Sequence, residues 1–379
     1  MPPEAFLLVS LSGRGLARAA ARADRAAVGM DAFADRDTCD LARLWEKAPM
    51  DDAWEFAADA LLAGADRLSP PGRCQGLIYG SGFEARPELL ARLARGRPLL
   101  GNAPETLARA GDPASFFDLV RRLGLPHPET RAAPPADPAN WLVKRAGASG
   151  GLHVRCATAG TAGNGDYFQR RLPGTPCSLL FLADGCDLVP VGCNRLLPAP
   201  PPAPTPWAYA GAVTLDGLPD GLEAEVLAAA RALTAELGLV GLNGIDFLVD
   251  GGGWHLLELN ARPTATLELW DADPLPALFD LHVATCRAGA AARLPASLPR
   301  PAGARAVAVA YAPAPIRIPA GFPWPDWCAD LPRRGAEIHP GEPVCSVRTW
   351  AEHAAGAETL ALSRRRTILE RLVHIHAAC

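Results

Sequence analysis

Two runs of apolar residues in the middle of the chain flank a turn of three glycines at 251–253. The pattern predicts an antiparallel hairpin over residues 239–264, because a glycine turn between two strand-like runs is typical of that structure. If the three glycines form the whole loop, Asp246 falls opposite Glu258, and Asn260 shares their face because strand side chains alternate. A loop one residue shorter would shift the register and place Asp246 opposite an apolar neighbour.

Three oxygen-bearing side chains therefore converge on one patch of the predicted hairpin. Like charges in a cross-strand pair destabilise a sheet, so the pair of Asp246 and Glu258 calls for a neutralising group. Two carboxylates and the amide oxygen of Asn260 are hard-oxygen ligands of the kind that Mg²⁺ prefers. A bound cation is the functional interpretation. A solvated polar face on an edge hairpin is the alternative that the hairpin alone leaves open.

The first 98 residues alternate strand-like and helix-like patterns. An apolar run at 6–9 is followed by a glycine turn at 12–15, a helical pattern at 16–23 and a short strand that ends at Asp31. This order imitates a dinucleotide-binding fold, but the turn lacks the G-x-G-x-x-G spacing. We therefore predict a nucleotide-type α/β fold that does not bind the nucleotide. The glycine-rich segment 80–84 is predicted to form a tight turn, with substrate contact as the alternative.

A lysine and a glycine-rich loop follow the next predicted strand. Residues 141–144 read WLVK, and residues 145–151 read RAGASGG. Glycines allow successive N–H groups to point at an anion, and a nearby lysine adds positive charge. Lys144 and this loop are thus a candidate phosphate site, although the P-loop spacing is missing. A flexible hairpin with an incidental lysine is the alternative.

Later segments predict further elements. Residues 221–237 have the helical spacing of apolar side chains, and prolines crowd the stretch 197–206, which predicts a stiff surface loop. Beyond about residue 295, a proline-rich joint precedes a strand at 306–311 and a final helix at 358–372. These elements predict a small α+β appendage that packs on the rest of the chain.

Composition narrows the class of protein. The 379 residues are 49% hydrophobic and 21% charged, and the net charge of −4 gives no basic footprint for nucleic acid. Ten cysteines without C-x-x-C spacing indicate reduced thiols. The start of the chain lacks the basic region of a signal peptide, and no apolar run approaches the ~20 residues of a membrane span. We expect a cytoplasmic protein with neither nucleic acid nor a membrane as partner.

A lysine before a glycine loop, followed at a distance by an acid and an E-x-N sequence on paired strands, resembles the ATP-grasp superfamily. The proline–glycine turn and the final helix resemble a group of predicted ATP-dependent carboligases related to biotin carboxylase. The resemblance implies an α/β fold with α+β lobes. Its parts would be a Rossmann-like pre-ATP-grasp domain at residues 1–98, an ATP-grasp domain at 99–295 with a small lid lobe at about 131–175, and a C-terminal α+β appendage at 296–379.

The resemblance also implies roles for single residues. The metal ligands would be Asp246, Glu258 and Asn260, binding Mg²⁺ or alternatively Mn²⁺. The ATP phosphates would be bound by Lys144, Gly147, Ser149, Gly150 and Gly151. Adenine would be recognised at the hinge between two lobes by Gln169, Arg171 and Leu172. Arg262 matches an arginine that contacts the substrate or the transferred phosphate, and it joins Lys144 as a candidate catalytic residue.

The activity implied is that of an ATP-dependent carboxylate–amine ligase, which forms an amide through an acyl phosphate and releases ADP and phosphate. Such ligases serve cofactor or amino-acid-conjugate biosynthesis. An ATP-grasp kinase or carboxylase and a degenerate, non-catalytic nucleotide-binding module are the alternatives. Two departures favour the module: Pro113 replaces a phosphate-contacting lysine, for which Arg145 or Arg109 is a candidate substitute, and Pro176 replaces a ribose-binding acid. The expected partners are a small-molecule carboxylate and an amine, and a homodimer is left open.

Overall fold

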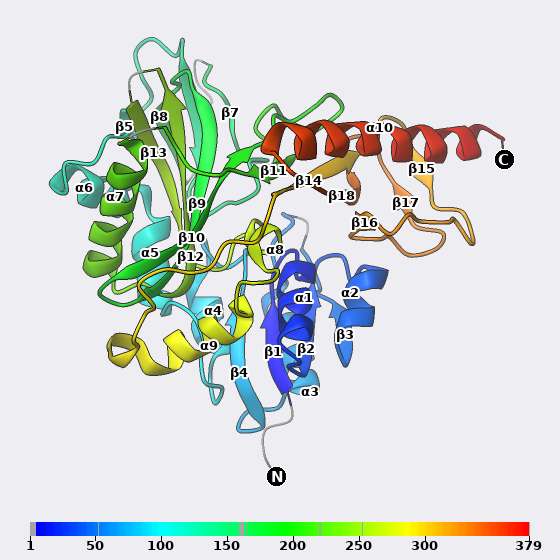
Figure 1. Cartoon of the computed structure of the whole chain (residues 1–379), viewed down its shortest axis with the longest axis horizontal. Coiled ribbons are helices and arrows are strands. Elements are labelled where there is room, and N and C mark those ends of the chain that lie inside the picture. Colours follow the sequence, from blue (N-terminus) through cyan, green and yellow to red (C-terminus); the bar gives the residue numbers. More distant parts are fainter. Residues whose placement is uncertain are drawn as a thin grey trace.

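The computed structural model describes residues 5–51, 53–158, 163, 165–219, 221–251 and 253–378. Its largest element is an eight-stranded sheet in which all neighbouring strands are antiparallel. Figure 1 shows this sheet crossing the molecule from the predicted hairpin to the C-terminal segment. Its strands, in spatial order, are β13 (Gly253–Asn260), β12 (Val240–Asp250), β9 (Thr175–Asp184), β10 (Leu188–Leu196), β11 (Gly211–Thr214), β14 (Ala304–Tyr311), β18 (Pro343–Ala351) and β16 (Cys328–Ala329).

A second, parallel sheet is built from the N-terminal residues, in the order β3-β2-β1-β4. Its strands are β1 (Ala5–Val9), β2 (Ala27–Asp31), β3 (Leu44–Lys47) and β4 (Cys74–Tyr79). It is accompanied by the helices α1 (Arg14–Arg22), α2 (Arg36–Leu41), α3 (Ala58–Leu68) and α4 (Pro87–Leu93). The strands β1 and β2 are buried along their whole length, as expected where helices cover both faces of a parallel sheet.

The glycine turn after β1 packs closely against the ring of Trp45. A Cβ atom at Gly13 would lie 2.2 Å from the ring of Trp45, so only glycine fits there. The Gly13 N–H donates to Asp31 at 2.8 Å, and Asp31 also accepts from the Ala34 N–H at 2.6 Å. Asp31, at the end of β2, therefore fixes the backbone of two loops, the one after β1 and the one after β2.

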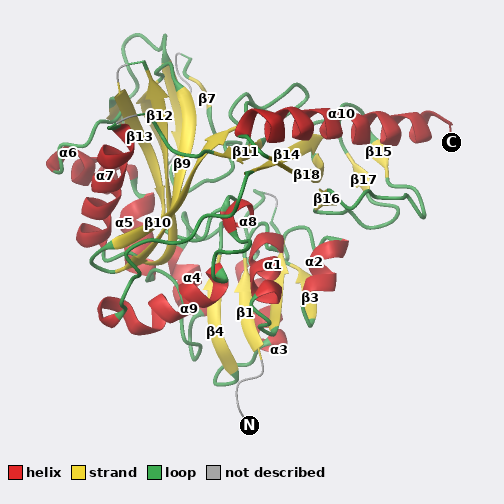
Figure 2. Ribbon diagram, viewed as in Figure 1, coloured by secondary structure: helices red, strands yellow, loops and turns green. Residues whose placement is uncertain are grey.

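A third, smaller sheet stands over the hairpin. Its order is β5 (Thr130–Arg131), β8 (Asp166–Arg170), β6 (Trp141–Arg145) and β7 (Arg155–Cys156). One face holds a small apolar cluster of Trp141, Val143, Ala157 and Phe168. Figure 2 shows helices beside the hairpin, which are α5 (Pro104–Gly111), α6 (Pro113–Arg122) and α7 (Leu222–Leu237). The predicted helix at 221–237 is thus confirmed as α7.

Buried polar groups join the N-terminal sheet to the start of the hairpin. The Tyr79 hydroxyl, at the end of β4, donates to the carbonyl oxygen of Ala261 at 3.2 Å. The Asn102 side chain donates to Asn243 at 2.7 Å and accepts from the Val240 N–H at 2.9 Å. These contacts bring the carboxyl ends of the parallel strands to the hairpin.

Three C-terminal strands, β14, β18 and β16, extend the main sheet, whereas β15 (Ile316–Arg317) and β17 (Glu337–Ile338) form a separate two-stranded sheet. β14 pairs with β11, so the strand predicted at 306–311 covers what would otherwise be an open sheet edge. The segment also contains the long helix α10 (Ala354–Ala378), which packs on β14 and β18. Between hairpin and C-terminal segment lie α8 (Leu267–Trp270), α9 (Leu278–Ala288) and a 3₁₀ turn (Gly289–Ala291). In the part of the chain described here, no helix is long and apolar enough to cross a membrane.

Candidate active site

The hairpin has the predicted pairing of Asp246 with Glu258, but its turn differs from the predicted one. Asp250 pairs with Gly253 and Phe247 with Leu256, so the expected three-residue loop was wrong by one residue. A β-bulge then follows at Leu257, and Asp246 pairs with Glu258 as predicted. A bulge inserts one extra residue into one strand. It therefore cancels the shorter turn and restores both carboxylates to one face.

The two carboxylates titrate as a pair. Burial, the charge of Glu258 and a hydrogen bond between the two side chains hold the pKa of Asp246 well above its usual range. Burial opposes ionisation of Glu258 too, but Lys144, the hydrogen bond with Asp246, His153 and Arg262 together bring the pKa of Glu258 below its usual range. When no cation is bound, one proton held between two such buried carboxylates reduces the repulsion between them, as a bound cation would.

The ligand set suits a hard divalent cation. The Asn260 side chain donates to Asp246 Oδ2 at 3.4 Å, which fixes the amide beside the carboxylates. Its oxygen accepts from Arg262 at 2.9 Å and retains a second lone pair for a metal. Among the described residues, no three His, Cys, Asp or Glu side chains are arranged so that they could hold a metal ion together. Asn260 would therefore supply the third protein oxygen, and the residues present fit Mg²⁺.

This pairing predicts a pH dependence of metal binding. An Asp246 pKa that is raised in the folded state means that stability, without a cation, falls as the pH rises through that pKa. Mg²⁺ replaces the shared proton, so its stabilising effect should grow with increasing pH. Thermal melts with and without MgCl₂ across a pH series measure this effect. In Asp246→Asn the gain with pH should vanish, and an equal gain in wild type and variant would contradict the assignment.

The small sheet directs its second face at the carboxylates. Lys144 pairs with Tyr167, and Leu142 with Gln169, so these four side chains share one face of β6 and β8. Lys144 is 6% exposed; burial lowers its pKa, while Glu258 and Asp246 oppose that shift. Burial and the charge of Glu258 raise the pKa of Tyr167. The predicted phosphate lysine and the predicted metal ligands therefore lie together.

The glycine loop after Lys144 packs between two other segments. Gly147, Gly150 and Gly151 all have φ near +70°, the left-handed region that glycine tolerates. A Cβ atom at Gly147 would lie 2.5 Å from the backbone of Ala85, and one at Gly151 would lie 1.7 Å from the carbonyl oxygen of Trp207. Gly147 lines one cavity together with Glu258 and Asn260, and phosphate binding by Gly147, Ser149, Gly150 and Gly151 stays a prediction.

The loop offers a matched pair of substitutions. Gly150 and Gly151 have φ values of 72° and 74°, but a Cβ atom at Gly150 would meet nothing within 4 Å. Gly151→Ala should therefore lose about 1–3 kcal/mol more stability than Gly150→Ala, because only it overpacks the contact with Trp207. Urea unfolding of both variants measures the difference. Equal losses would show that backbone strain alone decides the outcome.

The predicted hinge lies at the far end of β8. Gln169 is buried and donates to Thr130 Oγ1 at 3.5 Å, while the Arg171 N–H donates to the carbonyl oxygen of Asn140 at 2.7 Å. Leu172 is half-buried in the connection between β8 and β9. The Arg171 N–H is thus engaged within the small sheet, and adenine recognition at this hinge stays a prediction.

Arg262 joins the hairpin to the N-terminal sheet. Its side chain is buried; Nε donates to Glu84 Oε1 at 2.5 Å and Nη2 to Asn260 Oδ1 at 2.9 Å. The other Glu84 oxygen accepts from the N–H groups of Gly82 and Phe83. The predicted tight turn at 80–84 thus places a carboxylate in the site.

Two site residues were missed by the sequence reasoning. Glu84 ends the glycine-rich turn after β4, a position whose signal was the strand-end loop itself. His153 follows the glycine loop and faces Glu258. Burial and Lys144 lower the pKa of His153, against the opposing effect of Glu258. Nothing in the spacing of His153 marked it as a site residue.

The space at the centre of the site is small. A cavity of about 60 Å³ is lined by Glu84, Pro113, Arg145, Gly147, His153, Tyr167, Glu258 and Asn260, among others. This volume is well below the ~300–1,000 Å³ of typical ligand pockets, so a nucleotide can bind only if the lining residues move apart. Arg145, not Arg109, lines this cavity, since Arg109 donates to the carbonyl oxygen of Glu236.

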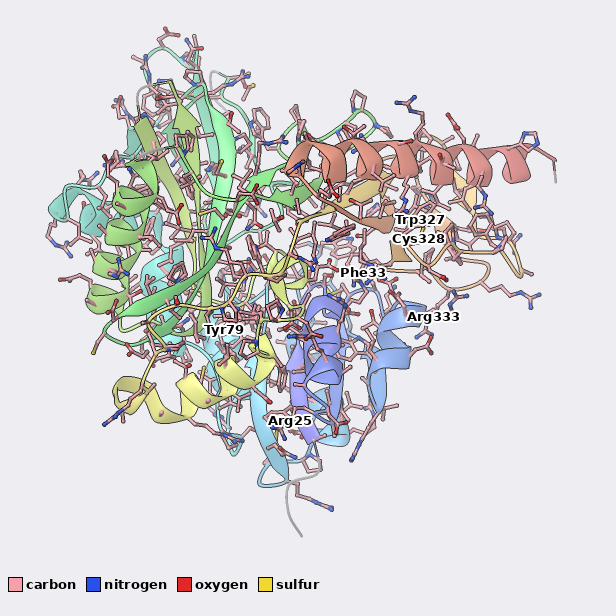
Figure 3. All side chains as sticks on the ribbon, viewed as in Figure 1. Arg25, Phe33, Tyr79, Trp327, Cys328 and Arg333 are labelled. Carbon is pink, nitrogen blue, oxygen red and sulfur yellow. The ribbon has the colours of Figure 1, made fainter. Side chains whose placement is uncertain are left out.

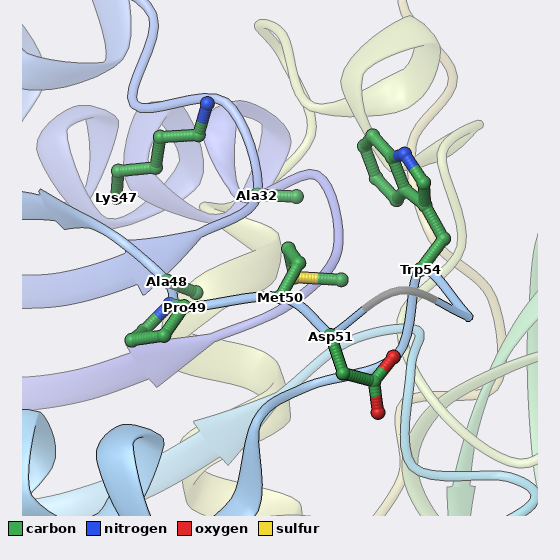
Figure 4. Close-up of a pocket in the computed structure, with 7 residues that line it drawn as sticks. All are labelled: Ala32, Lys47, Ala48, Pro49, Met50, Asp51 and Trp54. Carbon is green, nitrogen blue, oxygen red and sulfur yellow. The ribbon is translucent and has the colours of Figure 1, made fainter.

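The larger cavity of about 460 Å³ lies elsewhere (Figure 4). It sits at the carboxyl ends of β2 and β3, and its lining residues are Ala32, Lys47, Ala48, Pro49, Met50, Asp51 and Trp54. None of the predicted site residues lines it. We place the active site at the smaller cavity because the charged groups converge there.

Comparison with known proteins shows a likeness over a segment that contains the hairpin. The sequence profile of a family described as "ATP-grasp domain" matches residues 110–266. The large chains of carbamoyl phosphate synthase from Deinococcus deserti and Deinococcus radiodurans are each 29% identical to this chain, over 221 and 224 residues. Each match covers 51% of this chain and 21% of the relative, so the chain matches about a fifth of the length of these curated relatives.

Solved structures share the fold at low sequence identity. The biotin carboxylase domain of Hydrogenobacter thermophilus 2-oxoglutarate carboxylase, a dimer in complex with MgADP, ADP and bicarbonate, has a TM-score of 0.69 and 14% identity, covering 94% of this chain and 89% of its own. Biotin carboxylase from Campylobacter jejuni, in complex with an ATP analogue, has a TM-score of 0.69 and 14% identity, covering 94% and 90%. At such identities the likeness shows the fold.

Proposed function

We propose, from the premise that residues 110–266 form an ATP-grasp domain, that this protein is an ATP-dependent ligase that joins a carboxylate to an amine. The α/β ATP-grasp fold expected from the sequence is confirmed by the structural relatives, whereas the amide-forming reaction is our own proposal. Mg²⁺ and ATP are the implied cofactor and co-substrate, and the H. thermophilus domain bound MgADP.

The observation that carries the proposal is the arrangement of charges around the hairpin. Lys144 on the small sheet is close enough to Asp246 and Glu258 for their charges to act on it, and Arg262 donates to Asn260 beside them. Two positive side chains, Lys144 and Arg262, thus lie near the proposed Mg²⁺ site. This arrangement suits a polyphosphate and a second anion. A guanidinium is planar and can hold a carboxylate through two parallel hydrogen bonds. Arg262 is therefore proposed to orient the substrate carboxylate.

The chemistry needs positioning more than a protein nucleophile. A carboxylate oxygen of the substrate attacks the γ-phosphorus, the bond from that phosphorus to the β–γ bridging oxygen breaks, and ADP leaves with the electron pair. When bound, Mg²⁺ neutralises charge on the phosphates. Lys144, shielded from water, faces the same charge from the lid. The amine then attacks the acyl carbon, loses a proton, and phosphate departs to leave the amide.

The activity is testable without knowing the substrates. Metabolites should be screened in carboxylate and amine pairs for ADP release by the full chain with MgATP. The proposal predicts release only when both members of a pair are present. Release driven by bicarbonate alone would indicate a carboxylase-type reaction, and ATP binding without release by any pair would indicate a nucleotide-binding module.

A homodimer is proposed by analogy with the dimeric H. thermophilus domain, and sedimentation velocity would test it.

A further inference from the structure

The cavity of about 460 Å³ beside the N-terminal sheet is separate from the proposed active site. It lies where β2 and β3 end, at the edge of a parallel sheet where ligands collect in open α/β folds. Its volume falls within the ~300–1,000 Å³ of typical ligand pockets. The exposed Lys47 and Trp54 line it together with the buried Ala32 and Ala48. The cavity is therefore accessible from solvent and reaches the packed interior.

One wall of the cavity is an aromatic ring that is exposed yet held in place. Trp54 is 58% exposed, and its ring packs on that of Phe33 with 5.7 Å between the centroids. The loop that carries Phe33 is itself held, because Arg333 Nε donates to the carbonyl oxygen of Ala34 at 3.1 Å. Figure 3 labels Phe33 and Arg333 on the side of the N-terminal sheet that faces the C-terminal strands. Much of the Trp54 ring is thus left open to a ligand.

The backbone that presents this ring is strained. Trp54 has a φ of +63°, in the left-handed region that bulky side chains rarely adopt and that costs stability. Asp51 holds the turn, since its Oδ1 accepts from the N–H groups of Ala53 at 3.0 Å and Glu55 at 2.9 Å. Figure 4 shows the Asp51 carboxylate pointing away from the Trp54 ring. Strained backbone of this kind clusters at ligand sites.

The other wall carries a positive charge. Figure 4 shows the Lys47 side chain across the cavity from Trp54. The chain has two lysines, both in its described part, and the other one, Lys144, is only 6% exposed. The acid next to Lys47 on β3, Glu46, pairs with Arg67. The exposed ammonium group of Lys47 is therefore available to an anion.

We propose that this cavity binds a small aromatic carboxylate, with its ring against Trp54 and its carboxylate on Lys47. Aromatic rings attract each other in offset or edge-to-face arrangements. Met50 lines the cavity between the two residues (Figure 4), and thioethers make favourable contacts with ring edges.

The charge of the cavity selects a carboxylate. An ammonium group forms a charge-assisted hydrogen bond with a carboxylate. A single lysine balances one negative charge, whereas a phosphate monoester carries about −1.5 to −2 at neutral pH. No residue proposed for the ligase reaction lines this cavity, so the site does not depend on the proposed function.

The test uses the full chain, without ATP, and 2-naphthoate as the probe. Calorimetric titration should show saturable binding. The amide 2-naphthamide lacks the charge and cyclohexanecarboxylate lacks the aromatic ring, so each should bind about tenfold more weakly or less. Bound 2-naphthoate should also protect Lys47 from acetylation by an N-hydroxysuccinimide ester, as measured by mass spectrometry, whereas an equal concentration of acetate should not.

Substitutions at the two walls should weaken binding independently. Lys47→Gln and Trp54→Ala should each lower the affinity for 2-naphthoate about tenfold, by loss of the charge-assisted contact and of the aromatic contact. Lys47→Arg keeps the charge and should bind nearly as wild type does. Trp350→Ala is the matched control, because Trp350 is 56% exposed but lies on β18. Both walls are exposed side chains, so the variants should fold.

Several outcomes would overturn the proposal. These are absence of saturable binding, wild-type affinity in Lys47→Gln or Trp54→Ala, and equal affinity for 2-naphthamide. AMP that binds more tightly than 2-naphthoate, with the same dependence on Lys47 and Trp54, would identify a phosphate site instead.

Arg262→Ala separates this site from the active site, and it should bind 2-naphthoate as wild type does. Binding that is lost in Arg262→Ala but kept in Lys47→Gln would place the probe at the active site and refute the proposal. The screen for ADP release is independent of this titration. Failure of that screen would refute the ligase and leave the aromatic carboxylate site standing, and failure of the titration would do the reverse.

Discussion

Replacing Asp246 or Glu258 by alanine is expected to abolish Mg²⁺-dependent ATP turnover while the fold stays intact. Both carboxylates are buried on one face of the hairpin and share a proton in the absence of a cation. Removing either one would leave a single carboxylate and the Asn260 amide to hold Mg²⁺, with one fewer oxygen ligand and one fewer negative charge. The fold should survive because each substitution shortens one side chain and leaves the backbone pairing of β12 and β13 in place.

The measurement is ADP release with saturating MgATP, together with the melting temperature of each variant. Asp250→Ala is the matched control, since Asp250 lies at the turn end of the same hairpin, 3.5 Å from His255. Asp246→Asn adds an isosteric variant that retains the packing. Undiminished turnover in Glu258→Ala would remove the basis of the metal assignment.

Arg262→Ala should leave nucleotide affinity nearly unchanged and cripple the coupled reaction. If the guanidinium orients the substrate carboxylate, losing that charge-assisted contact costs about 1.5–3 kcal/mol, or roughly ten- to hundredfold in turnover. Lysine should rescue little, because an ammonium cannot make the bidentate pair. In Arg262→Ala, the buried Glu84 carboxylate also loses its ion pair with Arg262. The alanine variant therefore tests two contacts at once.

Glu84→Gln separates the two roles of Arg262. This variant weakens the brace to the N-terminal sheet but leaves the guanidinium in place beside Asn260. A substrate role predicts that Glu84→Gln keeps nearly full coupled turnover while Arg262→Ala does not. A purely bracing role predicts equal losses of turnover, thermal stability and ATP binding in both variants, as measured by kinetics and calorimetry.

The sequence was sufficient for the chemistry of the hairpin but not for its geometry. Alternation placed Asp246, Glu258, Asn260 and Arg262 on one face, and all four are found together. The turn was nevertheless one residue shorter than expected, and the bulge at Leu257 that compensates for it has no sequence signal of its own. A local pattern reports which side chains share a face, whereas bulges arise from how a strand meets its neighbours.

The features that the sequence did not predict depend on contacts between segments that are distant along the chain. Glu84 enters the site because a strand-end loop of the N-terminal sheet meets Arg262, which is 178 residues away along the chain. The C-terminal strands were predicted as an appendage, but β14 completes the main sheet by pairing with β11. Neither pairing follows from periodicity, because both depend on which sheet edge another segment covers. The domain boundaries at residues 98 and 295 stay predictions.

The acyl phosphate is the central claim, and an isotope tests it most directly. With the carboxylate and amine found by the screen, the carboxylate oxygens are labelled with ¹⁸O and the released phosphate is analysed by mass spectrometry. Attack of a carboxylate oxygen on the γ-phosphorus carries that oxygen into the phosphate, so the account predicts one ¹⁸O atom in each phosphate released. Unlabelled phosphate, formed at the same rate as ADP, would contradict it.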